Sequence, residues 1–275
     1  MRRSRSIIGR FDLSRTAAAG LALVLLPLSQ AWAAGSCHVV ARHEPKLVPA
    51  AAAHRLAEDE LRLTFVGHAT FLIESPGGVR VATDYNDYVR PEVVPDVATM
   101  NLAHSTHHSS NPDPAIGHVL RGWNPEGGPA RHDLRVGDVR IRNVPTNIRD
   151  WAGGTDYGGN SIFVFELADL CVAHLGHLHH RLTSEHLAEL GPVDVVLVPV
   201  DGSWTLRLDA MMEVLGEIKA PLMIPMHFFG PSTLERFLAR AGEEGCEIAR
   251  SDTPSVVLSR ATLPGRPTVL VLPGH

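Results

Sequence analysis

The hydrophobic and polar positions in the first part of the chain alternate in short segments that predict β-strands. Residues 61–74 (LRLTFVGHATFLIE) alternate and are rich in β-branched residues, and residues 77–84 (GGVRVATD) follow after a Ser-Pro-Gly-Gly turn. This pattern is typical of a hairpin or meander. Residues 132–145 and 160–176 each indicate two more strands around a tight turn, and 97–104 is a further short apolar run.

The pattern changes beyond residue 182, where helices alternate with strands. Residues 193–200 (VDVVLVPV) form a continuous β-branched run, as expected of a strand covered on both faces, and 220–230 is another apolar run. Helical spacing of apolar residues is present in 183–190, 206–218 and 231–245. This order, with strands first and alternating helices and strands later, predicts two β-sheets with helices packed outside them.

The first residues carry the pattern of an export signal. Arginines precede an apolar run from about Ala17 to Leu28, and Ala31-Trp32-Ala33 is a small-x-small triplet. The apolar run is shorter than the ~20 residues of a membrane span. We therefore expect a signal peptide over residues 1–33, no stable transmembrane span after its cleavage, and a periplasmic or secreted protein. An uncleaved anchor is one alternative, and a lipid anchor on Cys37 is another.

Composition and charge restrict the class of protein. The chain has 275 residues, 44% hydrophobic and 20% charged, which is typical of a globular protein. The net charge is −5, and Lys and Arg are scattered, so no nucleic-acid partner is expected. Residues 34–60 lack periodicity and are expected to form a linker or loosely docked arm, followed by one domain over 61–275.

Three cysteines, Cys37, Cys171 and Cys246, allow at most one internal disulfide. Cys171 and Cys246 each lie beside apolar, strand-like residues. We interpret these two as buried small hydrophobic residues.

Histidines gather at the ends of three predicted strands. Neutral imidazoles that converge from separate strands are typical of a site for zinc or a related divalent ion, because rigid strands fix the direction of the side chains that follow them. The alternative is that each histidine only forms hydrogen bonds at a strand end. The candidates are His104, His107 and His108 in AHSTHHSSN, His174 and His177 in AHLGHLHH, and His227 in IPMHFFG.

Several of these motifs, taken in order, resemble the metallo-β-lactamase superfamily. They are FVGHATFLIE, HSTHHS, GGNSIFVFE, HLGH, DVVLVPVDG and IPMHFFG, and the similarity extends over about residues 61–231. The chain is similar in particular to the branch of this superfamily around ascorbate-6-phosphate lactonase and N-acyl phosphatidylethanolamine phospholipase D. The resemblance implies an α/β fold, an αββα sandwich of two mixed β-sheets with helices on the outer faces and a metal site at one edge. The order of strands and helices given above fits this fold independently.

The resemblance also implies metal ligands. The family carries a His-x-His-x-Asp-His loop, then a histidine, a Gly-Asp pair whose carboxylate bridges two metals, and a late histidine. By position, His104 matches the first loop histidine, His174 the next one and His227 the late one. His177 stands at the place of the bridging aspartate.

The metal-binding loop departs from the family pattern. Thr106, His108 and Ser109 occupy the places of the second histidine, the aspartate and the last histidine. If the loop has shifted, His107 supplies the missing nitrogen. Two adjacent histidines cannot both point inward from an extended chain, so the choice between His107 and His108 stays open.

These departures predict the number of metal ions. A carboxylate can bridge two cations with its two oxygens, whereas the neutral imidazole of His177 presents one lone pair. We therefore expect one ion, or two only with unusual ligation, with zinc favoured and iron or manganese as alternatives. Asp84 stands where the family places an acid that hydrogen-bonds a ligand histidine, although a turn-capping role is the alternative. His68 is expected to support the site rather than to bind the metal.

Other residues near the expected site are assigned roles outside the metal shell. His179 and His180 are expected to face solvent, and contact with substrate is the alternative. The glycine-rich stretch 153–160 lacks the residues of a phosphate loop and is interpreted as a turn or a mobile loop over the site. The tryptophans expected either to line a substrate groove or to pack are Trp123, Trp151 and Trp204.

The function predicted from these features is that of an exported metal-dependent hydrolase. A metal-activated water at a His-rich site would cleave a lactone, amide or phosphodiester bond in a small-molecule or lipid-like substrate. One alternative is a non-catalytic metal-binding envelope protein of the same fold. Another is a mononuclear iron oxygenase.

Overall fold

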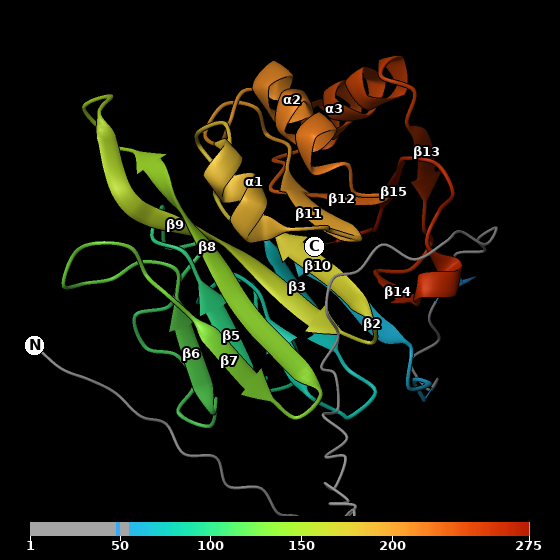
Figure 1. The fold of residues 1–275 in the computed structure, drawn as a ribbon, viewed down its shortest axis with the longest axis horizontal. Coiled ribbons are helices and arrows are strands. Elements are labelled where there is room, and N and C mark those ends of the chain that lie inside the picture. The colour runs from blue at the N-terminus through green and yellow to red at the C-terminus, as the bar shows by residue number, and fades with distance from the viewer. Residues whose placement is uncertain (1–47, 50–54, 275) are drawn as a thin grey trace, which may run out of the picture. The chain divides into compact units, whose positions relative to one another are not determined.

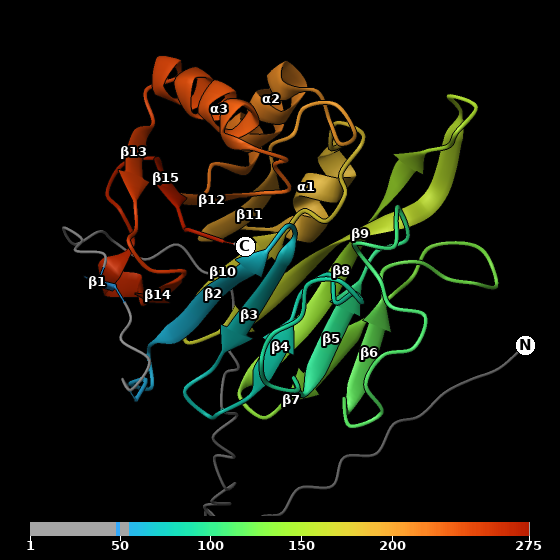
Figure 2. The same cartoon turned by 180° about the vertical axis from the view of Figure 1, so that it is seen from behind.

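The computed structural model describes residues 48–49 and 55–274, and the strands of these residues form two mixed β-sheets packed face to face. Sheet B lies nearer the viewer in Figure 1, and sheet A lies nearer in Figure 2. The predicted fold class, a sandwich of two mixed sheets with helices outside, is confirmed. The expected signal peptide and Cys37 lie outside the described residues.

Sheet A is antiparallel at one end and parallel at the other. The neighbours β4 and β5, and β5 and β6, run parallel, and the remaining neighbours are antiparallel. In spatial order, its seven strands are β1 (Val48–Pro49), β14 (Ser255–Leu258), β2 (Leu61–Gly67), β3 (Thr70–Glu74), β4 (Arg80–Ala82), β5 (Val97–Met100) and β6 (His118–Arg121).

Sheet B has parallel strands at the end formed by the later part of the chain. Its order is β13 (Glu247–Arg250), β15 (Thr268–Val271), β12 (Leu222–Met226), β11 (Val195–Pro199), β10 (Leu170–His174), β9 (Thr155–Leu167), β8 (Val139–Arg149) and β7 (Asp133–Val136). Strands from β13 to β10 are parallel neighbours, and those from β10 to β7 are antiparallel. Ala168 and Asp169 join β9 to β10 with positive φ at both positions, as a two-residue hairpin turn requires.

The core consists of one layer between the sheets and another between sheet B and the helices. Strand β11 contributes to both, because successive side chains of a strand point to opposite faces. Val195 and Leu197 pack between the sheets, while Val196 and Val198 pack toward the helices. This two-sided burial explains the uninterrupted apolar run that the sequence shows at this strand.

All three α-helices of the described residues pack against sheet B (Figure 1). They are α1 (Ser184–Leu190), α2 (Leu208–Ile218) and α3 (Pro231–Glu243), and a 3₁₀ turn covers Arg260–Thr262. Thr183 caps α1 by accepting a hydrogen bond from the backbone of His186, and Pro231 begins α3. Loop residues such as Tyr85 and Ile116 pack against Ala82 and Ala98 of sheet A.

Some expectations differ from the structure. Val48–Pro49 lies within the expected linker but pairs with β14. In the glycine-rich stretch 153–160, only Gly153 and Gly154 precede β9. The prediction of a loop over 153–160 is therefore wrong for most of its length, because residues from Thr155 onward pair with β8. The sequence pattern also missed β6, β13, β14 and β15. Within the described ranges, no helix has both the length and the apolar character that crossing a membrane requires.

Cys171 is buried at 1% exposure and is disulfide-bonded, whereas Cys246 is half-buried and free. The expected burial of Cys171 is therefore observed, although it does not carry a free thiol.

Candidate metal centre

Three residues of the candidate site lie within two residues of the end of a strand and have left-handed backbone. His68 after β2, Asp84 after β4 and His227 after β12 have φ of 51°, 41° and 53°. Such angles are unfavourable for residues other than glycine and occur preferentially at functional sites. Here they turn the chain where strands of both sheets end at one edge of the sandwich.

Four histidines bring their ring nitrogens together at this edge. His104, His107, His177 and His227 each offer one ring nitrogen, and these atoms lie within 4.8 Å of one another. The Nε2 atoms of His104 and His177 are 2.7 Å apart, and those of His107 and His227 are 3.1 Å apart. His104 is partly exposed and the other three are buried. Of the six predicted ligands, the structure therefore brings four together.

Two of these histidines are held from behind by buried carboxylates. Asp84 Oδ2 lies 2.5 Å from His107 Nδ1, which is the kind of contact expected of Asp84, and Asp201 Oδ1 lies 3.1 Å from His227 Nδ1. Burial raises the pKa of Asp84 to about 6. Burial would also raise the pKa of Asp201, but hydrogen bonds from His227 and Thr205 outweigh it and hold that pKa below its usual range.

The carboxylates determine which nitrogen of each ring carries the proton. A carboxylate accepts, so the facing Nδ1 atoms of His107 and His227 donate, and their Nε2 atoms carry lone pairs. Burial, followed by the neighbouring His227, lowers the pKa of His107 well below its usual value and keeps its ring neutral. Two lone pairs that face each other at 3.1 Å repel unless a cation lies between them. The residues therefore fit a divalent ion such as zinc.

His177 is held differently, by another histidine. Its Nδ1 is hydrogen-bonded to His179 Nε2, and the backbone N–H of Arg149 donates to His179 Nδ1 over 2.7 Å. The backbone N–H of His177 donates to Asn160 Oδ1 over 2.8 Å. Burial and then His107 lower the pKa of His177, while burial and then Arg149 lower the pKa of His179 to about 3.

The structure does not bring His174 into the cluster. Its Nε2 lies 2.8 Å from the carbonyl oxygen of Ala69, and the backbone N–H of Gly176 donates to its Nδ1 over 3.1 Å. Because both nitrogens have partners, His174 ties β10 to the turn between β2 and β3. It has the structural role that was the alternative to metal binding.

His108 also points elsewhere. Its Nδ1 is 3.2 Å from the carbonyl oxygen of Asn101, and its ring packs against Trp123, with 5.5 Å between ring centroids. Of the adjacent pair, His107 is thus the one that points inward. Trp123 accordingly packs in the loop region rather than lining the pocket described below.

His68 lies beside the cluster without joining it. Its ring centroid is 4.2 Å from that of His227, and its carbonyl oxygen accepts the backbone N–H of His227 over 2.7 Å. His68 Nε2 is buried and has no hydrogen-bond partner in the described part of the chain. Burial and then His227 lower its pKa to about 3.

Sequence reasoning missed Asp201 and Arg149 and assigned His179 wrongly. His179 was expected to face solvent but is only 8% exposed, because it packs between His177 and the end of β8. Asp201 could have been found, since it closely follows the strand run DVVLVPV just as Asp84 follows VRVA. Nothing local indicates Arg149.

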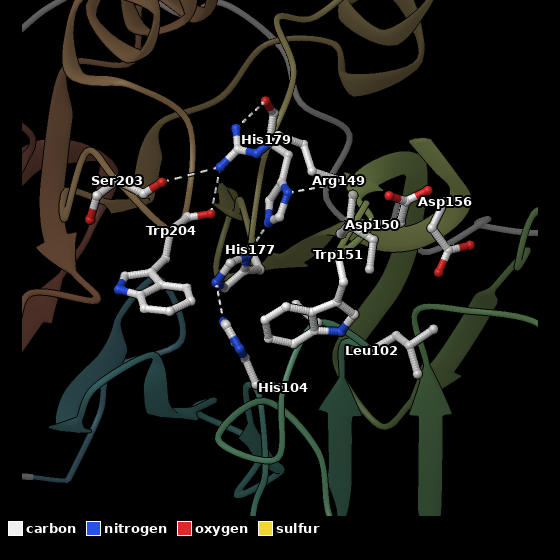
Figure 3. A pocket seen from close by; sticks show the side chains of 12 residues that line it. Leu102, His104, Arg149, Asp150, Trp151, Asp156, His177, His179, Ser203 and Trp204 are labelled. Atoms are coloured by element: carbon white, nitrogen blue, oxygen red, sulfur yellow. Dashed lines mark hydrogen bonds between the residues drawn. The ribbon is translucent and has the colours of Figure 1, made fainter. Parts of the chain in front are cut away.

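A pocket of about 450 Å³ opens onto His104 and His177 (Figure 3). Trp151 and Trp204 lie on either side of this pair, and their side chains are 91% and 53% exposed. Asp156 lies farther out along the same pocket. The candidate metal centre therefore faces a cavity with aromatic walls.

Arg149 fixes one wall of this pocket. Its guanidinium donates to the carbonyl oxygens of Ser203, Trp204 and Thr205 over 3.2, 2.8 and 3.0 Å. It also donates to the carbonyl oxygen of His179 over 3.4 Å. Arg149 therefore joins the end of β8 to the segment that carries Trp204.

Comparison with known proteins identifies the family. The model of the β-lactamase superfamily domain matches residues 62–227, more than half of the chain. The chain therefore belongs to the metallo-β-lactamase superfamily, as its motifs suggested. The match begins in β2 and ends at His227, so it contains all four clustered histidines.

Relatives of this chain cover most of its length. A protein of Methanoregula boonei described as a metal-dependent hydrolase is 26% identical over 212 residues, covering 72% of this chain and 94% of the relative. A crystal structure from Thermotoga maritima, assigned as a Zn-dependent hydrolase of this superfamily, is 28% identical with a TM-score of 0.57 and covers 78% of this chain and all of that one. A structure of a metallo hydrolase from Ignicoccus hospitalis is 18% identical with a TM-score of 0.50, and covers 68% of this chain and 92% of that one. At this identity the likeness shows the common fold alone.

Proposed function

We propose that the protein is an exported metal-dependent hydrolase that cleaves a lactone, amide or phosphodiester bond in a small-molecule or lipid-like substrate. The observation that carries the proposal is the pair of carboxylate-backed histidines, His107 and His227, whose Nε2 lone pairs meet beside a pocket. Relatives described as metal-dependent hydrolases support the same class of reaction.

A single ion fits the donor set best. The carboxylates of Asp84 and Asp201 each bond a histidine ring, and neither belongs to the group of converging ligand atoms. His177 occupies the place where the family has a bridging carboxylate, so this group of histidines contains no residue that can bridge two cations. Zinc is the favoured ion because imidazole nitrogen is a ligand that it commonly takes, with iron or manganese as alternatives.

In this proposal, different residues of the chain have different roles. A bound ion would polarise the carbonyl or phosphoryl group and help to generate the attacking hydroxide near neutral pH. Asp84 and Asp201 hold the rings of His107 and His227 in position, while Trp151 and Trp204 bind apolar parts of the substrate. His104 lines the pocket and belongs to the histidine cluster, so it connects the bound substrate with the ion.

Export is supported by two features. The N-terminal residues have the pattern of a signal peptide, and Cys171 is disulfide-bonded. Disulfides persist in oxidising compartments such as the periplasm and the extracellular space. We therefore propose a periplasmic or secreted location.

The test combines metal content with turnover. Purified protein is loaded with zinc, assayed for bound metal, and incubated with panels of lactones, amides and phosphodiesters. We expect one zinc per chain and hydrolysis in one panel. His107→Ala should lose both metal and activity, whereas His118→Ala, which changes an exposed histidine of β6, should retain both. Metal binding without turnover on any panel would reject the hydrolase and favour a metal-binding protein.

A further inference from the structure

The hydrogen bonds around His177 run in one direction, and a backbone amide fixes that direction. The N–H of Arg149 donates to His179 Nδ1 over 2.7 Å. A backbone amide can only donate, so His179 Nδ1 carries a lone pair. In the neutral ring of His179, the proton is therefore on Nε2.

The same reasoning extends to the next ring. His179 Nε2 is hydrogen-bonded to His177 Nδ1, and because His179 donates, His177 accepts. The proton of the neutral His177 ring is therefore on Nε2, the atom that lies 2.7 Å from His104 Nε2.

His177 thus differs from the other two buried histidines of the cluster. Carboxylates behind His107 and His227 leave lone pairs on the nitrogens that face the centre. The histidine behind His177 leaves an N–H at the same place. An imidazole nitrogen that carries a proton has no lone pair to give to a metal.

We propose that His177 acts as a hydrogen-bond donor to the substrate and is not a metal ligand, so that His104, His107 and His227 alone hold the ion. The part that concerns substrate rests on the proposed function. An ion that takes the lone pair of His104 Nε2 removes the acceptor of the His177 N–H. Leaving a buried N–H unpaired is unfavourable, and His177 lines the pocket, so a substrate oxygen becomes its acceptor.

The substrate class follows from this donor. The acceptor is a carbonyl or phosphoryl oxygen that gains negative charge as the bond to be cleaved is attacked. A donor fixed in advance on such an oxygen lowers the barrier of the reaction. The family's bridging aspartate could not serve in this way, because a carboxylate accepts. With His177 at this position, the site loses a carboxylate that could bridge two metal ions and gains an N–H that can donate a hydrogen bond to the substrate.

The number of imidazoles bound to zinc tests the proposal. X-ray absorption spectroscopy of the zinc-loaded protein should show three imidazoles in the wild type and three in His177→Gln. His177→Gln should bind zinc within about threefold of the wild type, whereas His227→Ala should lose more than about a hundredfold, beyond the usual effect of residues that only contact a ligand. His180→Gln is the matched control for loss of a neighbouring histidine and should change neither quantity. Four imidazoles in the wild type, falling to three in His177→Gln, would overturn the proposal.

A second readout does not depend on any variant being folded. In the zinc-loaded wild type, ¹⁵N NMR of the histidine rings should show His177 protonated on Nε2, whereas a ligand bound through Nε2 would be protonated on Nδ1. The second result would overturn the proposal.

Turnover separates this proposal from the proposed function. With a substrate found in the panels, His177→Ala should reduce kcat by about 10²–10³, the effect of removing one such donor, and His177→Gln, whose amide can donate, should recover part of it. Hydrolysis by a four-imidazole site would reject the donor and keep the hydrolase. Three imidazoles without turnover on any panel would reject the hydrolase and keep the three-ligand metal site.

Discussion

At the scale of single residues, the group behind each histidine determines what the ring can do. His107 and His227 are backed by carboxylates, His177 by another histidine, and His174 has partners on both ring nitrogens. The residue type is the same in all four cases, yet only some of them offer a lone pair to a cation. The supporting residues should therefore influence metal binding nearly as much as the ligands themselves.

Replacing Asp84 tests this influence. Asp84→Asn keeps the size of the side chain but removes the charge behind His107 Nδ1, so the ring becomes a weaker ligand. We expect zinc affinity to fall about 10- to 100-fold, measured by competition with a chromophoric chelator. Asp133→Asn, which removes a charge from an exposed ion pair with Arg140, is the control and should leave affinity unchanged. Equal affinity in both variants would contradict the role given to Asp84.

The exposed tryptophans make a separate prediction about substrate binding. Trp151 is 91% exposed and lines the pocket, so Trp151→Ala should raise KM several-fold with little change in kcat if its ring only contacts bound substrate. The control is Tyr157→Ala, because Tyr157 is 79% exposed in the same β8–β9 hairpin but does not line this pocket. A fall in kcat with unchanged KM in Trp151→Ala would contradict a role limited to binding.

At the scale of elements, the ends of strands carry the site, and this feature was predictable from the sequence. Alternation predicted β2 and β3, the unbroken apolar run predicted β11, and the histidines at strand ends predicted the location of the cluster. The direction of each ring was not predictable. It depends on left-handed backbone at His227 and on partners far along the chain, such as the Ala69 carbonyl oxygen that bonds His174. Local patterns do not encode such contacts.

Gly176, between His174 and His177, tests how the turn after β10 positions the site. It has φ of 61°, and a Cβ there would lie 2.4 Å from Asn160 Oδ1, the atom that accepts the backbone N–H of His177. Gly176→Ala should lower the free energy of unfolding by about 1–3 kcal/mol, measured by urea denaturation.

A second glycine gives a control with the opposite sign. Gly216 lies on the exposed side of α2, and a Cβ there would meet no atom within 4 Å. Gly216→Ala should raise the free energy of unfolding by about 0.5–1 kcal/mol, because alanine loses less conformational freedom in a helix. If both variants changed the free energy of unfolding in the same direction, the turn at position 176 would not require glycine.

At the scale of the whole molecule, the candidate metal centre joins the two sheets. His104 and His107 lie in the loop after β5 of sheet A, whereas His177 and His227 follow β10 and β12 of sheet B. An ion held by histidines from both sheets connects the two layers at one edge of the sandwich. Metal binding should therefore stabilise the folded state as a whole and not only the site, since the unfolded chain does not assemble this group.

Removal of the metal tests this connection. With free zinc at 100 times its dissociation constant, binding should stabilise the folded protein by about 2.7 kcal/mol. For a domain of this size, that corresponds to a rise in Tm of about 5–10 °C over the protein treated with a chelator, measured by calorimetry. His107→Ala should show no zinc-dependent rise, because it lacks a ligand from sheet A. An equal Tm with and without zinc in the wild type would mean that the histidines do not join the sheets through an ion.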